Sequence, residues 1–289
     1  MRKIIIIILV AISTVLAACI IINVVRKDKK DYVLTNRMIN NYTVGEDERR
    51  INQVLYFNRD NIYNNYDIVN SISFVDEDNE SILKLKVNNI KKTGYTHKYK
   101  GIKYFSYVYD LSIPSTSSDL YFNNCKLEIV SEDHFLYVPI GIVSIKYDEY
   151  NASNKPIIVN NLEGSCNYDP YQTLSKIKIT LENKTNNNIT ITSMNMGNKV
   201  DLVKEENDKV IFNSNNLDIN ETIIGYMEKE LELSLSYKAR FVLKESYIEI
   251  NYTDILGSHK VYIDTFNYYD NGYILPESDD LIYSSNFKV

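Results

Sequence analysis

The chain of 289 residues contains no tryptophan, three cysteines, three histidines, five prolines and nine glycines. The low proline and glycine content excludes collagen-like and proline-rich low-complexity architectures. His97, His134 and His259 are far apart in the sequence, and no two cysteines have the spacing of a zinc-binding motif. There is also no glycine-rich phosphate-binding loop. The sequence therefore predicts neither a metal site nor a cofactor.

Basic residues are fewer than acidic ones, 32 Lys and Arg against 38 Asp and Glu, for a net charge of −6. Without residues 1–30 the counts become 26 and 37, a net charge of −11. This acidity, and the lack of a basic stripe interleaved with aromatic residues, argue against nucleic acid as a partner. A hydrophobic content of 44% with 24% charged residues is typical of a globular protein and excludes a wholly disordered chain.

A long apolar run lies near the N terminus. Ile4 to Val25 contains 22 residues without a charge, and Arg26 to Lys30 follow as a polar stop. As a helix this run would measure about 33 Å, enough to cross a hydrocarbon core of about 30 Å. We therefore predict that residues 1–30 anchor the chain in the cell membrane, with most of the chain outside the cytoplasm.

Two other interpretations of this segment stay open. The stretch Leu16-Ala17-Ala18-Cys19 resembles the lipobox of bacterial lipoproteins, which implies cleavage before Cys19 and lipidation of its thiol. Ile20-Ile21-Ile22 departs from that family, in which a short polar linker usually follows the cysteine. An ordinary cleaved signal is the third alternative. All three place the rest of the chain outside the cytoplasm.

Beyond the anchor we predict three parts. Residues 31–45 are polar and lack periodicity, so they are expected to form a linker. Residues 46–150 are predicted to form a β-rich domain with one short helix, and residues 151–289 a β-sandwich domain. The helix is placed at Glu46–Asn58, because Ile51, Val54 and Leu55 recur at helical spacing.

The rest of the chain alternates apolar and polar residues with a period of two. Examples are Leu83-Lys84-Leu85-Lys86-Val87 and Lys176-Ile177-Lys178-Ile179. Many short strands with one apolar face, separated by polar turns, are typical of antiparallel sheets packed face to face. We predict a mainly β fold with two sandwich units, or one extended sandwich. Among the 25 tyrosines, Tyr104, Tyr247 and Tyr262 are predicted to lie on outer faces.

The stretch from Ser175 to Phe266 resembles the immunoglobulin-like sandwiches of bacterial cell-envelope proteins. The resemblance lies in the strand pattern of Ile177 to Asn183 and in the closing hairpin from Ile248 to Gly257. It covers about a third of the chain and implies a fold rather than an activity. The Cys…Trp…Cys hallmark of antibody domains is missing, because the chain has no tryptophan.

Cys125 and Cys166 are candidates for a disulfide. In an oxidising compartment such a bridge would stabilise the fold by about 4 kcal/mol. Two buried thiols are the alternative, and a thiolate paired with His134 or His259 would depend on the fold bringing these residues together.

The function predicted from these features is that of a non-catalytic binding, adhesion or accessory module at the cell surface. Its partner would be a protein or a carbohydrate. The alternative is a cell-envelope hydrolase of wall sugar or peptide, with carboxylates on sandwich loops and His134 or His259 nearby. A closed apolar cavity between the two units would instead indicate a small-ligand sensor.

Overall fold

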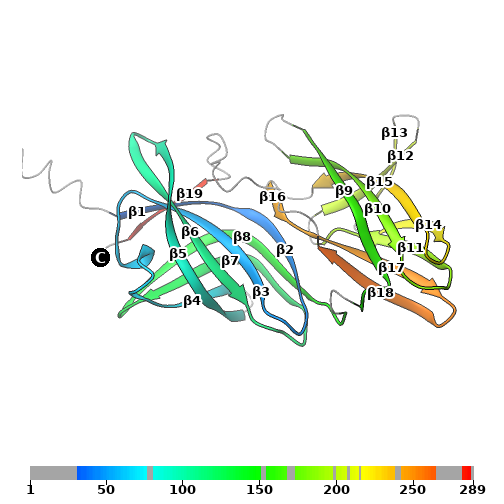
Figure 1. Ribbon diagram of the computed structural model, residues 1–289. Coiled ribbons are helices and arrows are strands. Elements are labelled where there is room, and N and C mark those ends of the chain that lie inside the picture. Colours follow the sequence, from blue (N-terminus) through cyan, green and yellow to red (C-terminus); the bar gives the residue numbers. More distant parts are fainter. Residues whose placement is uncertain are drawn as a thin grey trace, which may run out of the picture.

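The computed structural model describes residues 31–76, 81–150, 154–167, 173–197, 200–206, 209–214, 216–237, 242–264 and 282–287. In these ranges the chain is almost entirely β-strand, with one short 3₁₀-helix, η1 (Ile62–Asn64). The mainly β prediction is therefore confirmed. The strands form one large sheet and a separate pair of sheets, and each of the two units has its own hydrophobic core (Figure 1).

The first unit is a single ten-stranded sheet with the strand order β16-β2-β8-β7-β4-β5-β6-β3-β1-β19. Most of its strands come from residues 31–147, and two come from much later in the chain. Their bounds are β1 (Asp31–Asn36), β2 (Met38–Val44), β3 (Arg49–Phe57), β4 (Val69–Asp76), β5 (Ser81–Tyr99), β6 (Ile102–Ile113), β7 (Leu120–Ser131), β8 (His134–Tyr147), β16 (Val242–Glu245) and β19 (Ile282–Phe287).

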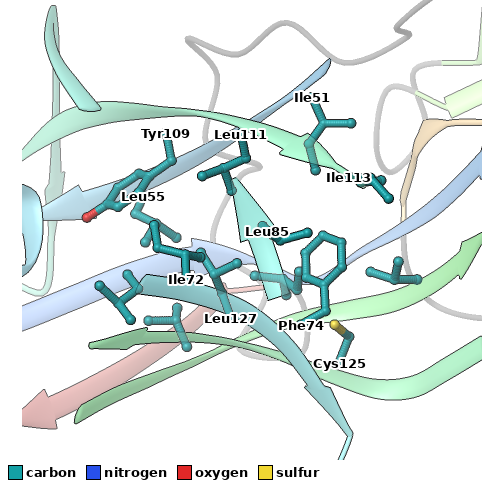
Figure 2. Close-up of a cluster of buried hydrophobic side chains, with 14 of the residues drawn as sticks. Ile51, Leu55, Ile72, Phe74, Leu85, Tyr109, Leu111, Ile113, Cys125 and Leu127 are labelled. Carbon is teal, nitrogen blue, oxygen red and sulfur yellow. The ribbon is translucent and has the colours of Figure 1, made fainter. Parts of the chain in front are cut away.

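This sheet is rolled rather than flat. Only Arg37 separates β1 from β2 in sequence, yet the two strands belong to opposite ends of the sheet, where β1 pairs with β3 and β2 pairs with β8. The segment therefore connects the two ends of the sheet around a common core. Figure 2 shows side chains of this core converging from several strands, including Phe74, Tyr109 and Leu127.

The second unit is a sandwich of a five-stranded sheet, β13-β12-β15-β10-β9, and a four-stranded sheet, β14-β11-β17-β18. The apolar faces of both sheets form one core. The orders β9-β10-β15-β12 and β11-β17-β18 correspond to the ABED and CFG sheets of immunoglobulin domains. The bounds are β9 (Ile157–Asn167), β10 (Thr173–Asn183), β11 (Ile189–Asn195), β12 (Val200–Glu206), β13 (Lys209–Ser214), β14 (Leu217–Ile223), β15 (Glu228–Tyr237), β17 (Tyr247–Asp254) and β18 (Gly257–Asp264).

Two predicted segments are wrong. The linker predicted at 31–45 is strands β1 and β2, and the helix predicted at Glu46–Asn58 is largely strand β3. Polar residues in β2 such as Asn41 are fully buried, because the second unit packs against this strand and supplies hydrogen-bond partners from Met196 and Ser246. In β3 the side chains of Ile51 and Leu55 join the main core, whereas that of Val54 joins a smaller cluster. Because both faces of β2 and much of β3 are buried, their sequences lack the alternation of apolar and polar residues that would have predicted a strand.

Three further expectations concern exposure and the membrane. Tyr104, Tyr247 and Tyr262, predicted on outer faces, are buried. Tyr104 packs in a cluster with Leu34 and Tyr99, and the rings of Tyr247 and Tyr262 meet edge to face at 5.4 Å. The apolar run Ile4 to Val25 lies outside the described residues. Among the residues that are described, none belongs to a helix with the length and apolar character needed to traverse a bilayer.

The two units meet through a buried polar junction. The Asn41 amide of β2 donates to the hydroxyl of Ser246 (3.3 Å) and to the carbonyl of Met196 (3.5 Å). Glu245, at the end of β16 and directly before Ser246 in the chain, forms an ion pair of 2.6 Å with Arg49 of β3, which ties this connection between two sandwich strands to the first sheet. Buried polar groups need such partners, since an unsatisfied one is costly. The junction therefore fixes the second unit against the first.

Candidate binding site

The segment between β3 and β4 forms a rigid loop around η1. Asn61 caps this helix, because its side-chain oxygen accepts from the amide of Tyr63 (3.0 Å) and its own amide donates to the side chain of Asn64 (3.0 Å). This reciprocal arrangement is a capping box. The Tyr63 side chain is buried in the core of the first unit, and its carbonyl accepts from the hydroxyl of Tyr109 (2.7 Å).

The same loop is tied to the beginning of β1. The carboxylate of Asp31 pairs with the guanidinium of Arg59, and the side chain of Asn58 accepts from the amide of Tyr32 (2.9 Å). Asp31 is only 3% exposed, so this ion pair sits at the edge of the core. These contacts hold the loop in one position relative to the sheet.

A charged group lies where the loop faces β5 and β6. The ammonium of Lys92 is 2.6 Å from the carboxylate of Asp60, and the hydroxyl of Tyr107 donates to that carboxylate. Lys92 and Tyr107 lower the pKa of Asp60, and desolvation together with Asp60 raises the pKa of Tyr107 to about 12. The Lys92 nitrogen also lies 4.4 Å from the ring centre of Phe105, a cation–π contact.

A hollow of about 640 Å³ lies between this charged group and the loop. Tyr66 lines the hollow and is 45% exposed. Asn61 also lines it, and its amide nitrogen is buried without a hydrogen-bond acceptor among the described residues. The volume falls in the range of small-molecule sites, which combine apolar walls with a few placed polar groups. The arrangement can bind a ligand that offers oxygen acceptors.

Four described carboxyl groups have a lowered pKa. A glycosidase needs one carboxyl group whose raised pKa keeps it protonated. Every resolved pKa shift among the described carboxyl groups is downward. Lys92 and Tyr107 lower the pKa of Asp60, and Arg50 lowers the pKa of Asp110. Lys184 lowers the pKa of Glu182, and the backbone amide of Leu256 lowers the pKa of Asp254. These groups stay ionised at neutral pH and act as hydrogen-bond acceptors.

The cysteines predicted from sequence lie away from this hollow. Cys125, in β7, is 1% exposed in the core of the first unit, and desolvation raises the pKa of its thiol. Cys166 belongs to β9 of the second unit, but its side chain lies outside the described residues, so its pairing stays a prediction. The lipidation candidate Cys19 also lies outside them.

The two histidines proposed for catalysis are in different units. His134 begins β8 of the first unit, whereas His259 in β18 lies 3.0 Å from Asp254 and stacks on the ring of Tyr252. His259 and Asp254 therefore brace the β17–β18 hairpin. Within the described ranges, no group of three or more His, Cys, Asp or Glu side chains is arranged to hold a metal ion.

Sequence reasoning missed the loop from Asn58 to Ile68. Its signal was present, because the stretch Asn58-Arg59-Asp60-Asn61 and the pair Asn64-Asn65 are rich in residues that cap helices and form turns. What the sequence could not show is that Lys92 and Tyr107, distant along the chain, lie beside this loop.

No protein-family model and no curated protein sequence matches the chain. Among solved structures, the C-terminal domain of the AgI/II polypeptide BspA of Streptococcus agalactiae is 8% identical, with 81% of this chain and 99% of that chain covered and a TM-score of 0.23. A DUF4785 family protein of Legionella pneumophila is 9% identical, with coverages of 83% and 58% and a TM-score of 0.23. The titin immunoglobulin tandem A164–A165 is 9% identical, with coverages of 81% and 95% and a TM-score of 0.20. Likenesses at these identities and TM-scores do not define a function for the chain.

Proposed function

We propose that this chain is a non-catalytic binding protein of the cell surface, and that the hollow beside η1 binds a carbohydrate. The observation that carries this proposal is the unsatisfied amide of Asn61 beside the exposed ring of Tyr66. A donor without an acceptor is costly, and a small shift of the buried Asn61 side chain would let its amide donate to a ligand oxygen in the hollow.

Carbohydrate is the ligand class that fits these groups best. Sugar hydroxyls both donate and accept, which matches the amides of Asn61 and Asn65 and the carboxylate of Asp60. The Tyr66 ring offers an apolar face with a polar tip, suited to the amphipathic face of a sugar ring. The capping box fixes these groups before a ligand arrives, which reduces the entropy lost on binding.

Residues 1–30 would hold the protein at the membrane. The support for this part of the proposal is the uncharged run from Ile4 to Val25, followed by the cluster from Arg26 to Lys30. Anchorage through a lipid on Cys19 would serve the same purpose.

A glycan array probed with the purified full-length chain tests this proposal. We expect the wild type to bind at least one class of surface glycan and Tyr66→Ala to lose that binding, because the variant removes the ring that the sugar would cover. Exposed Tyr121 lies on β7, and Tyr121→Ala is the matched control that should bind as the wild type does. The two variants should unfold within about 0.5 kcal/mol of the wild type.

Two results would reject the proposal. One is a wild type that binds no glycan on the array. The other is a Tyr66→Ala variant that binds as well as Tyr121→Ala, because the hollow would then take no part in binding. Cleavage of a bound glycan would favour the envelope hydrolase instead.

A further inference from the structure

The hairpin of β5 and β6 is the strongly basic part of an acidic molecule. Residues 81–109 contain seven lysines and no acidic residue, whereas the rest of residues 31–289 has 19 basic and 37 acidic residues. Every one of these lysines is exposed: Lys84, Lys86, Lys91, Lys92, Lys98, Lys100 and Lys103. Figure 1 shows the teal hairpin standing out from the body of the first unit.

The tip of this hairpin holds positive charges that the fold does not neutralise. Lys98 and Lys103 are directly opposite each other in the β5–β6 pairing. Like charges in that position destabilise a sheet. Neither lysine forms an ion pair with any residue that the structure describes. Nearby, Tyr95 is 62% exposed. An anionic partner would neutralise both charges at once.

The tip also lies beside the point where the N-terminal segment joins the folded chain. Tyr99 and Tyr104 of the hairpin pack in one cluster with Leu34 of β1, and Tyr32 packs against that cluster. Because β1 begins at Asp31, the basic sequence from Arg26 to Lys30 precedes this cluster directly in the chain. No linker separates the two, since the residues predicted as a linker are β1 and β2.

We propose that the tip of the β5–β6 hairpin rests on the anionic headgroups of the membrane that holds the chain. This inference rests on the membrane anchor of the proposed function. Anionic leaflets attract basic segments at their surface and repel the acidic remainder of the molecule, so the charge asymmetry orients the body with the hairpin toward the lipid. The exposed ring of Tyr95 suits the interfacial region, where tyrosine is enriched.

The observations favour a lipid surface over a nucleic acid. All seven basic residues are lysines, which act as point charges and lack the bidentate geometry by which arginine reads phosphates and bases. The position of the tip beside the entry of the anchor adds a geometric reason, because a membrane-held chain keeps this surface next to the headgroups.

Chemical acetylation of the full-length chain in lipid nanodiscs tests the inference. One disc contains phosphatidylcholine alone, and the other contains phosphatidylcholine mixed with phosphatidylglycerol. We expect Lys98, Lys100 and Lys103 to react at least about fivefold more slowly in the anionic discs. Lys176 and Lys184, exposed on the second unit, are internal controls that should react equally in both. Added salt should remove the protection, because it screens exposed charges.

A pair of variants makes the test specific. Lys98→Gln combined with Lys103→Gln should reduce the protection of Lys100, because the headgroups lose two of their contacts. Lys176→Gln combined with Lys184→Gln should leave the protection of Lys100 unchanged.

The outcomes separate this inference from the anchor on which it rests. A chain that is retained by the discs but shows equal acetylation of the hairpin in both compositions overturns the hairpin contact and leaves the anchor intact. A chain that the discs do not retain overturns the anchor and the hairpin contact with it. Binding of purified nucleic acid that competes with the discs for the hairpin would assign the surface to a different partner.

Discussion

At Gly141 the backbones of β2 and β8 approach closely. A Cβ atom on this residue would lie 2.3 Å from the carbonyl oxygen of Met38, and φ of Gly141 is +104°. Only glycine avoids both the steric conflict and the backbone strain. The parallel pairing of β2 with β8 therefore requires glycine at this position.

Gly141→Ala should lower the free energy of unfolding by about 3 kcal/mol or more, because strain and overlap add. Two other glycines serve as controls that separate the cost of backbone strain from the cost of steric overlap. Gly101 has φ of +82° but no described atom within 4 Å of its added Cβ, so Gly101→Ala should cost about 1 kcal/mol. At Gly94 an added Cβ has no described atom within 4 Å and φ is not in the positive range, so Gly94→Ala should cost neither strain nor overlap. Chemical denaturation of the three variants measures these differences, and equal losses for Gly141→Ala and Gly101→Ala would contradict the close approach.

Single residues also show where sequence reasoning fails. Asn41 is a polar residue that would be expected on the surface, but it is fully buried because Ser246 and Met196 from the second unit accept its amide hydrogens. Those partners lie far along the chain. No local pattern can reveal a polar residue that is satisfied in this way.

At the level of the strands, alternation predicted the sandwich unit well. Ile177, Ile179 and Leu181 of β10 are fully buried and Lys176 is exposed, as their spacing predicts, and Ile250 of β17 is fully buried too. These strands have one face in the core and one in solvent. Alternation is therefore preserved in the sequence.

Alternation failed where both faces of a strand are covered. In β3 the run from Gln53 to Phe57 is buried throughout, and its apolar residues happened to match a helical spacing. The basic hairpin was missed for another reason. Its lysines are divided between two strands, and only the pairing of β5 with β6 brings Lys98 and Lys103 together.

The hairpin makes a prediction about stability that needs no membrane. Lys98→Glu should raise the free energy of unfolding by about 0.5 kcal/mol, because an opposite-charge pair with Lys103 replaces two like charges. Lys91→Glu is the control, since Lys91 faces Val108 and gains no charged partner across the strands. Chemical denaturation at low salt compares the two. An equal change in both variants would show that net charge, and not the cross-strand pair, decides the effect.

At the level of the whole molecule, the two units are held together more firmly than two domains joined by a linker. Strand β16, from the connection between two sandwich strands, pairs with β2 of the first sheet, and Glu245 at its end pairs with Arg49. Ile39 and Ile142 of the first unit belong to the core of the second. The boundary predicted between residues 150 and 151 cannot anticipate this, because the contacts cross it.

The two surfaces proposed for binding belong to the same unit. The hollow beside η1 and the basic hairpin both belong to the first unit and share Lys92 and Tyr107, which line the hollow and lie on β5 and β6. The buried junction fixes the second unit against the first. In this account the membrane orients the first unit, and the hollow takes the ligand.

The most direct test of the account measures equilibrium binding of the glycan selected on the array to the wild type and to Asn61→Asp, with analysis of the glycan afterwards. Aspartate keeps the oxygen that caps the helix but removes the amide donor, so the variant should bind about tenfold more weakly. Its free energy of unfolding is measured alongside, because a carboxylate oxygen in this buried position lowers stability. The glycan should be recovered intact from both proteins. Equal affinities would show that the Asn61 amide makes no contact with the ligand, and a cleaved glycan would show that the protein is an enzyme.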